Sequence, residues 1–171
     1  FTIEGKVNHE DNVEKVGKVS RHIMREDLPE SITIGSSVKG EVDQKRRIQL
    51  RNHHTAAHII FTACRNILGP QVWQSGAKKT IKQAHLDITH FKSITKEQEL
   101  QIQDEANRIV MGAHYIKKDI RPKAETEKEF GFALYQGGVV PGNELRVVQI
   151  GDDVDIEACC GTHCDSTSEV G

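Results

Sequence analysis

Residues 54–58 of this chain read His-Thr-Ala-Ala-His, and residues 159–163 read Cys-Cys-Gly-Thr-His. Each stretch carries two metal-binding side chains at positions i and i+4. In a helix, this spacing places both side chains on one face, about one turn apart. Zinc prefers imidazole and thiolate and usually takes four ligands, so the two stretches would complete one site if they met in space. The sequence therefore predicts that a helix in the middle of the chain lies against a loop near its end.

The residue types leave some freedom in the ligand set. The predicted zinc ligands are His54, His58, Cys159 and His163. His53 is an alternative to His54, although it lies off the helical face that His54 shares with His58. Cys160 and Cys164 are alternatives to Cys159, because both lie in or next to the same turn.

The chemistry of such a site is also open. A zinc site closed by four protein ligands is usually structural, whereas a catalytic site keeps a position for water or substrate. The residues between His54 and His58 are Thr55, Ala56 and Ala57. The glutamate base of His-Glu-x-x-His metalloproteases is therefore absent, which argues against a protease. No glycine-rich phosphate loop and no Gly-x-Ser-x-Gly nucleophile motif is present either.

The composition fits one substantial folded domain, with or without a small appendage. The 171 residues are 36% hydrophobic and 28% charged, and they contain no apolar run long enough to span a bilayer. Three of the four cysteines lie within six positions beside a histidine. This crowding fits a metal site in a reducing compartment better than a disulfide framework, so we expect a cytoplasmic protein. No signal peptide opens the chain, and because Phe1 is not an initiator methionine, we expect a segment that was cut from something longer or processed.

The formal net charge of −2 provides no general basic footprint for nucleic acid. The run Lys45-Arg46-Arg47, followed by Arg51, is a local basic patch that could hold the acceptor end of a tRNA. From spacing alone, a solvated helix face is the simpler interpretation of this run.

The hydrophobic pattern predicts two long helices. The first follows an N-cap at Asp43 and ends near Gly69, and the second follows a capping box at residues 95–98 and ends near Gly112. The inner stripe of the first helix is Ala57, Ile60, Phe61, Cys64 and Leu68. The inner stripe of the second is Ile102, Ala106, Ile109 and Ala113.

Short strands are expected over residues 1–42 and at 81–90, 114–120, 145–150 and 154–158. Residues 72–76 resemble a turn, and Pro122 suits the start of a short helix ending near Gly131. This order predicts an α+β fold, with a mostly antiparallel sheet and helices packed on one face. We expect a small β-rich segment at residues 1–42 and the main domain at 43–171.

At these motifs the chain resembles the editing domain of alanyl-tRNA synthetase and its free-standing relatives, the AlaX trans-editing proteins. Residues 52–60 (Asn-His-His-Thr-Ala-Ala-His-Ile-Ile) and 157–164 (Glu-Ala-Cys-Cys-Gly-Thr-His-Cys) carry the resemblance. Residues 42–47, 72–76 and 86–90 are similar to further parts of the family, and the match covers roughly residues 38–171. The loop at 135–142 is similar to the archaeal version, which favours this family over threonyl-tRNA synthetase editing domains.

Two features depart from the family pattern. The family commonly has glycine where Cys160 stands, which puts a second thiol inside the turn. Residues 1–37 resemble the remnant of a β-barrel that neighbours the editing domain, so the N-terminal segment is expected to be a partial barrel.

The resemblance implies an activity. Alanyl-tRNA synthetase, an ATP-using ligase, mischarges tRNA(Ala) with serine or glycine, because a pocket built for a methyl group cannot strongly reject them. The editing domain hydrolyses the resulting ester of Ser-tRNA(Ala) or Gly-tRNA(Ala). The alternatives are a tRNA-binding module with a structural zinc and a free-standing AlaX-type deacylase. Oligomerisation, if any, would involve parts of the parent protein outside this chain.

The resemblance also implies residue roles. The zinc ligands would be His54, His58, Cys159 and His163. Gln74 would be the catalytic residue that orients water or the ester, although without the resemblance it is simply an exposed turn residue. Lys45, Arg46 and Arg47 would contact tRNA phosphates. The zinc would either activate water or anchor the amine and hydroxyl of the substrate.

Overall fold

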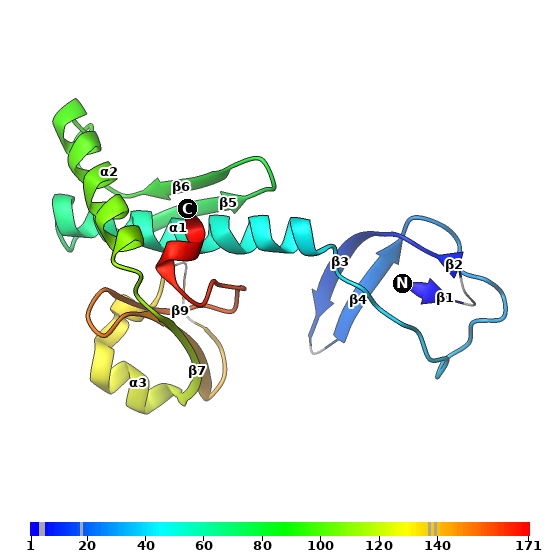
Figure 1. Cartoon of the computed structure of the whole chain (residues 1–171). Coiled ribbons are helices and arrows are strands. Elements are labelled where there is room, and N and C mark those ends of the chain that lie inside the picture. The colour runs from blue at the N-terminus through cyan, green and yellow to red at the C-terminus, as the bar shows by residue number, and fades with distance from the viewer. Residues whose placement is uncertain (4–5, 18, 137, 139) are drawn as a thin grey trace. The chain divides into compact units, whose positions relative to one another are not determined.

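The computed structural model describes residues 1–3, 6–17, 19–136, 138 and 140–171. The chain divides into two compact units, Phe1–Gln44 and Lys45–Gly171 (Figure 1). Over the described ranges, no helix has both the length and the apolar character needed to cross a membrane.

The first unit consists of two antiparallel hairpins. β1 (Thr2–Ile3) pairs with β2 (Lys6–Val7), and β3 (Glu10–Val16) pairs with β4 (Val19–Met24). Gly17 lies at the turn between β3 and β4 with a φ of 62°, a conformation that glycine adopts without steric cost. The β-rich character predicted for residues 1–42 is confirmed, whereas the origin of this segment in a barrel stays a prediction.

The second unit is built on α1 (Gln44–Leu68), which begins one residue after the predicted cap and confirms the first long helix. Four of the five predicted inner residues are buried, but Ile60 is 39% exposed. Ile59 is buried in its place, at 1% exposure. The physical reason is that α1 is covered on two sides, so its buried surface is wider than one stripe.

One side of α1 packs against a hairpin and the second long helix. β5 (Gln74–Lys79) pairs with β6 (Ala84–Ile88), and α2 (Lys96–Met111) follows. Phe61 and Cys64 of α1 share an apolar cluster with Leu86 of β6 and Ile102 of α2. Residues 74–76, predicted as a turn, are the beginning of β5, because pairing with β6 extends the backbone there.

The predicted capping box of α2 is present. The Thr95 hydroxyl accepts from the Gln98 amide at 3.2 Å, and the Gln98 side chain accepts from the Thr95 amide at 3.0 Å. Ile109 is buried as predicted, but Ala113 is exposed, because the helix ends at Met111 and Ala113 has a φ of 49°.

Thr95→Ala should lower the free energy of unfolding by about 1 kcal/mol, because the Gln98 amide in the first turn of α2 loses its hydroxyl partner. Urea denaturation measures this loss. Thr95→Ser keeps the accepting hydroxyl and should stay close to the wild type. Equal losses in both variants would contradict the capping role.

The other side of α1 faces a three-stranded antiparallel sheet in the order β7–β8–β9. Its strands are β7 (Ile116–Pro122), β8 (Glu144–Ile150) and β9 (Asp155–Ala158). The short helix α3 (Lys123–Phe130) and the 3-10 helix η1 (Gly131–Leu134) connect β7 to β8, and a second 3-10 helix, η2 (Thr167–Val170), ends the chain. Gly137 and Val139, which belong to the loop predicted before the last strands, lie outside the described residues.

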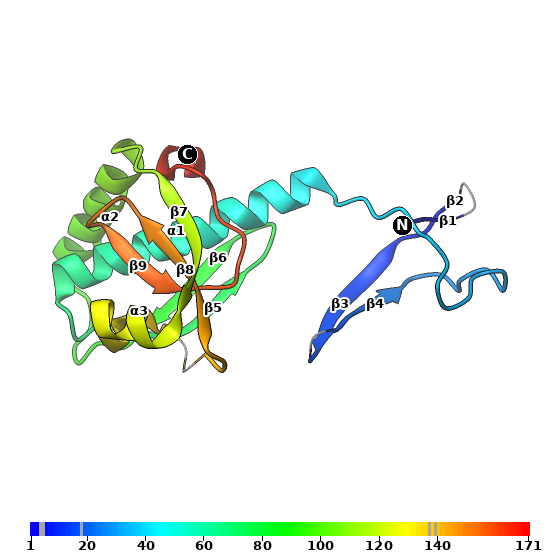
Figure 2. The same ribbon diagram turned by 90° about the horizontal axis from the view of Figure 1, so that it is seen from below.

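Alternate residues of β8 belong to two different apolar clusters. Val148 and Ile150 pack with Ile59 of α1, whereas Leu145 and Val147 pack with the segment around η1. Since side chains alternate across a strand, α1 and α3 cover opposite faces of this sheet (Figure 2). The predicted α+β class and antiparallel pairing are confirmed. The helices, however, cover both faces rather than one, and the described strands form four small sheets.

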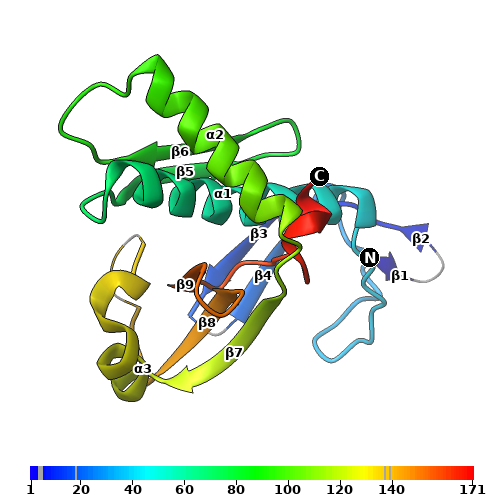
Figure 3. The ribbon, with the colours of Figure 1, turned by 60° about the vertical axis from the view of Figure 1, so that its left-hand side comes forward.

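The C-terminal segment is fixed at several points near the site. The Cys159 amide donates to the Arg146 carbonyl at 3.0 Å, and the Ile116 amide donates to the Asp165 carbonyl at 2.8 Å. η2 lies against the end of α2, where the Thr167 hydroxyl donates to the Ile109 carbonyl at 2.9 Å (Figure 3). The turn that follows β9 is therefore held to β8 at its start, and the segment after it is held to β7 and α2.

Candidate metal centre

The predicted convergence of the two motifs is found in the structure. One donor atom from each of four side chains lies within 4.8 Å of the other three donor atoms: His54, His58, Cys159 and His163. The Cys159 Sγ lies 3.3 Å from His163 Nε2 and 3.5 Å from His54 Nε2. Zinc–nitrogen and zinc–sulfur bonds of about 2.1 and 2.3 Å at a tetrahedral angle separate nitrogen and sulfur by about 3.6 Å. The spacing of these donors therefore fits a tetrahedral zinc ion.

The three alternative ligands have other surroundings. His53 faces the β5–β6 hairpin, with Nδ1 2.6 Å from the Thr80 carbonyl oxygen. The Cys164 thiol is buried and donates to Asn52 Oδ1 at 3.3 Å, and Cys160 is exposed. None of the three belongs to the cluster among the described residues.

The turn around Cys159 contacts the histidine helix very closely. A Cβ atom added to Gly161 would lie 1.9 Å from His54 Cε1 and 2.2 Å from His54 Nδ1. The amide of Gly161 also donates to Cys159 Sγ at 3.4 Å. Glycine is therefore the residue that lets the turn and the imidazole share this space.

Hydrogen bonds from α1 also orient the end of the turn. The Thr55 hydroxyl lies 3.4 Å from His163 Nδ1 and accepts from the Cys164 amide at 3.1 Å. With Nδ1 of His163 facing this hydroxyl, Nε2 is the nitrogen that faces Cys159.

The charges at the cluster suit metal binding. Burial alone would raise the pKa of Cys159, but hydrogen bonds from His163, His54 and His58 outweigh it and lower the pKa to about 3. Burial lowers the pKa of His163 to about 4, despite its contact with the Cys159 thiolate. At neutral pH these two residues are a thiolate and a neutral imidazole, the forms that bind a metal.

Two buried carboxylates, Asp155 and Glu157, lie beside Nδ1 of His58, at 3.6 and 3.0 Å. Burial, and then the charge of Asp155, raises the pKa of Glu157 to about 7. Burial would lower the pKa of His58, but Glu157 and Asp155 raise it well above its usual value. The metal motifs do not include these carboxylates. Their positions two and four residues before Cys159 would have placed them on its face of a strand.

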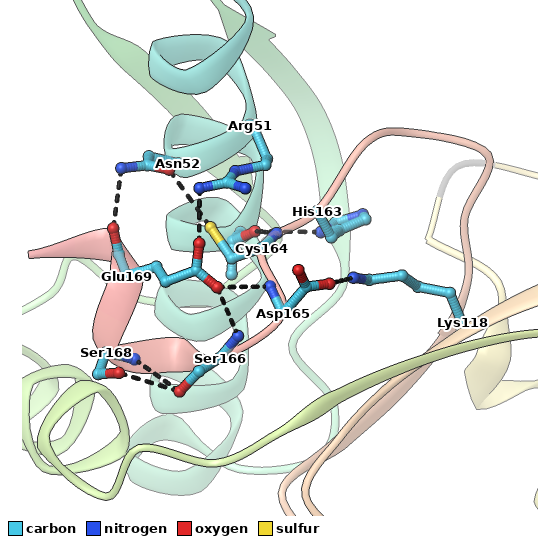
Figure 4. A network of polar contacts seen from close by, with 10 residues as sticks. Arg51, Asn52, Lys118, His163, Cys164, Asp165, Ser166, Ser168 and Glu169 are labelled. Carbon is cyan, nitrogen blue, oxygen red and sulfur yellow. Dashed lines mark hydrogen bonds and ion pairs between the residues drawn. The ribbon is translucent and has the colours of Figure 1, made fainter.

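A polar network holds the residues after His163 against α1 (Figure 4). Glu169 accepts from Arg51 at 2.6 Å and from the amides of Asp165 and Ser166 at 2.7 and 2.9 Å. The side chain of Asp165 forms an ion pair with Lys118 of β7. These contacts restrict the movement of the turn, because they fix the segment that leaves it.

Comparison with known proteins gives the same relationship over most of the chain. Residues 145–171 match the family model described as "Threonyl and Alanyl tRNA synthetase second additional domain". An alanine–tRNA ligase of Thermofilum pendens is 48% identical over 157 residues, which cover 92% of this chain and 17% of the relative. Those of Methanopyrus kandleri and Methanoregula boonei are 46% and 45% identical over 160 and 161 residues, 94% of this chain and 17% of each relative.

The chain is homologous to a segment of alanine–tRNA ligases. The resemblance to alanyl-tRNA synthetase inferred from the motifs is thereby confirmed. These relatives also favour a relationship to alanyl-tRNA synthetases over one to threonyl-tRNA synthetases. The chain spans about a sixth of the length of these relatives, that is, 17%.

The predicted tRNA-binding residues lie at the beginning of α1. Lys45, Arg46 and Arg47 are all exposed, as expected of either a phosphate contact or a solvated helix face. The Arg47 guanidinium donates to the Thr162 hydroxyl at 3.1 Å, so one residue of the run contacts the turn of the metal cluster. Binding of tRNA by these residues stays a prediction.

Gln74 begins β5 opposite Ile88 and is half-buried, not an exposed turn residue. Its catalytic role stays a prediction. Lys79, at the other end of β5, was not predicted. Burial lowers the pKa of this amine, whereas the charges of Cys159 and Glu157 raise it. Lys79 therefore lies within electrostatic reach of the metal cluster.

Proposed function

We propose that this chain is the editing unit of an alanine–tRNA ligase and hydrolyses the ester of Ser-tRNA(Ala) and Gly-tRNA(Ala). The observation that carries the proposal is the meeting of three imidazoles and one thiolate from distant motifs, within a segment homologous to such ligases. The ATP-dependent ligation and the cytoplasmic location of the parent protein are part of this proposal.

The donor set supports zinc as the cofactor. His54, His58, Cys159 and His163 would hold Zn²⁺, since imidazole and thiolate are its preferred ligands and their spacing suits its bond lengths. When bound, zinc supplies a positive charge that polarises a carbonyl, lowers the pKa of water or anchors an amine.

The protein would bind and orient the substrate with residues around the cluster. Lys45, Arg46 and Arg47 would contact phosphates of the tRNA acceptor end, next to the turn that Arg47 already touches. The side-chain amide of Gln74 can both donate and accept, so it could hold a water molecule against the ester carbonyl. Lys79 would add a positive charge beside the developing negative charge on the ester.

A second candidate function is a tRNA-binding module with a structural zinc. The favouring observation is that the protein itself provides four donors, as in closed structural sites. In that case one zinc would bind per chain, but mischarged tRNA would not be hydrolysed.

Deacylation of Ser-tRNA(Ala) distinguishes the two functions. We expect the zinc-loaded chain to release serine. His54→Ala should lower the rate of deacylation by about 100-fold or more, because losing a metal ligand should cost at least as much as losing a residue that only orients a ligand. Metal content and circular dichroism verify loading and folding in the same samples.

Cys160→Ala is the matched control, since this exposed thiol lies in the same turn but outside the cluster. It should deacylate like the wild type. Unchanged deacylation by His54→Ala would contradict the editing assignment. Zinc binding without any serine release, in this chain and in the full-length ligase, would favour the structural zinc.

A further inference from the structure

His58 contacts two carboxylates through the ring nitrogen Nδ1. This atom lies 3.0 Å from Glu157 Oε2 and 3.6 Å from Asp155 Oδ2. The three side chains are 4–8% exposed, so the contacts are shielded from solvent. Both acids come from β9, the strand that leads into the Cys159 turn.

A carboxylate at this place determines which nitrogen of His58 is available. A neutral imidazole carries one proton, and an anion facing Nδ1 favours the tautomer with the proton on that atom. The lone pair is then on Nε2. Outer carboxylates of this kind fix the tautomer and ring orientation of metal-binding histidines and raise their basicity.

The surroundings of Glu157 indicate that a nearby positive charge would stabilise its buried carboxylate. Its Oε1 is buried without a hydrogen-bond partner among the described protein atoms. A buried carboxylate with incomplete hydrogen bonding is costly, and an apolar residue of similar size would pack there at lower cost. A divalent metal with one thiolate ligand carries a net charge of +1, which one carboxylate would neutralise.

Asp155 is a weaker candidate for the same role. It is 0.6 Å farther from His58 Nδ1 than Glu157 is (3.6 against 3.0 Å). It also lines a cavity of about 440 Å³ together with Thr62 of α1.

We infer that Glu157 is a positioning residue for the metal ligand His58: its charge beside Nδ1 keeps the ring proton on that atom, so that Nε2 binds the ion. Asp155 reinforces this arrangement through its charge. The role rests on the proposed metal site but requires no particular reaction at it. It therefore concerns the affinity of the site for its ion.

Zinc affinity, measured by competition with a fluorescent chelator, tests this role. Glu157→Ala should weaken zinc binding by about 10- to 100-fold, the usual effect of removing such a partner. Glu157→Gln keeps an oxygen beside Nδ1 but removes the charge, so its zinc affinity should lie between those of the wild type and Glu157→Ala. Asp153→Asn, an exposed acid in the turn before β9, is the matched control and should bind zinc like the wild type.

Thermal unfolding in excess chelator separates positioning from a structural role. We expect the metal-free Glu157→Ala chain to be less stable than the wild type, because His58 loses its buried partner, and to lose zinc affinity as well. A less stable metal-free variant with unchanged zinc affinity would overturn the inference and show a structural role.

His58→Ala distinguishes failure of this inference from failure of the metal site. If His58→Ala loses zinc while Glu157→Ala binds it normally, the positioning role is wrong and the site stands. If both bind zinc like the wild type, the proposed site itself is wrong. The trio His58, Asp155 and Glu157 could also hold an ion of its own. Two zinc ions per wild-type chain, reduced to one by Glu157→Gln, would show that Glu157 is a ligand and overturn positioning.

Discussion

Replacing Ile59 with alanine should lower the free energy of unfolding of the second unit by about 2–5 kcal/mol. Ile59 is 1% exposed and packs with Ile109 of α2, Val148 of β8 and Cys164 of the C-terminal segment. The shorter side chain would leave a cavity where α1, α2 and the sheet meet. Because the neighbours belong to three different elements, they cannot close that cavity together without shifting.

The neighbouring residue provides the control for this prediction. Ile60→Ala removes the same atoms from the same helix, but Ile60 is 39% exposed and should lose less than about 1 kcal/mol. Urea denaturation followed by fluorescence reports on the second unit, because Trp73, the only tryptophan, lies in it. Equal losses in the two variants would show that Ile59 does not have the packing role described.

The same pair shows what sequence periodicity can determine. A stripe at three- and four-residue steps placed α1 and α2 correctly, because both helices are long and have clear start or stop signals. The prediction from this stripe placed Ile60 inside rather than Ile59, because it assumed that only one face of the helix is buried. Only the packing of the sheet against a second face of α1 buries Ile59, and such long-range packing leaves no local pattern.

Some features of the metal site could likewise be predicted from the sequence, and others could not. Four ligands of two types, in two motifs, were enough to predict that residues 105 positions apart, His54 and Cys159, lie together, because one ion needs all four ligands. The strand at Gln74 was missed, since pairing with β6 is a tertiary event. Glu157 was missed because acids that alternate with an apolar residue in a strand ordinarily face water. Here they face a buried histidine.

Gly161→Ala should weaken zinc binding by more than about 100-fold, the upper end of the effects seen for changes outside the ligands themselves. The added methyl group would lie 1.9 Å from His54 Cε1, far inside contact distance. Either the His54 ring turns away from the cluster, or the turn moves and carries Cys159 and His163 with it. Both responses separate ligands that now lie within 4.8 Å of one another.

Chelator competition measures the affinity, and circular dichroism verifies that the variant is folded. Cys160→Ala, one residue earlier and exposed, should bind zinc like the wild type. Wild-type affinity in Gly161→Ala would mean that the turn moves away at little cost, contrary to its fixation by Glu169 and the Lys118–Asp165 pair.

A double-mutant cycle identifies the clash as the cause. If Gly161→Ala acts by displacing the His54 ring, it should cost little further affinity in a His54→Ala background, where that ring is absent. If the two losses instead add in full, the methyl group disturbs the turn independently of His54. The non-additivity therefore measures how strongly the mid-chain helix and the C-terminal turn depend on each other for holding one ion.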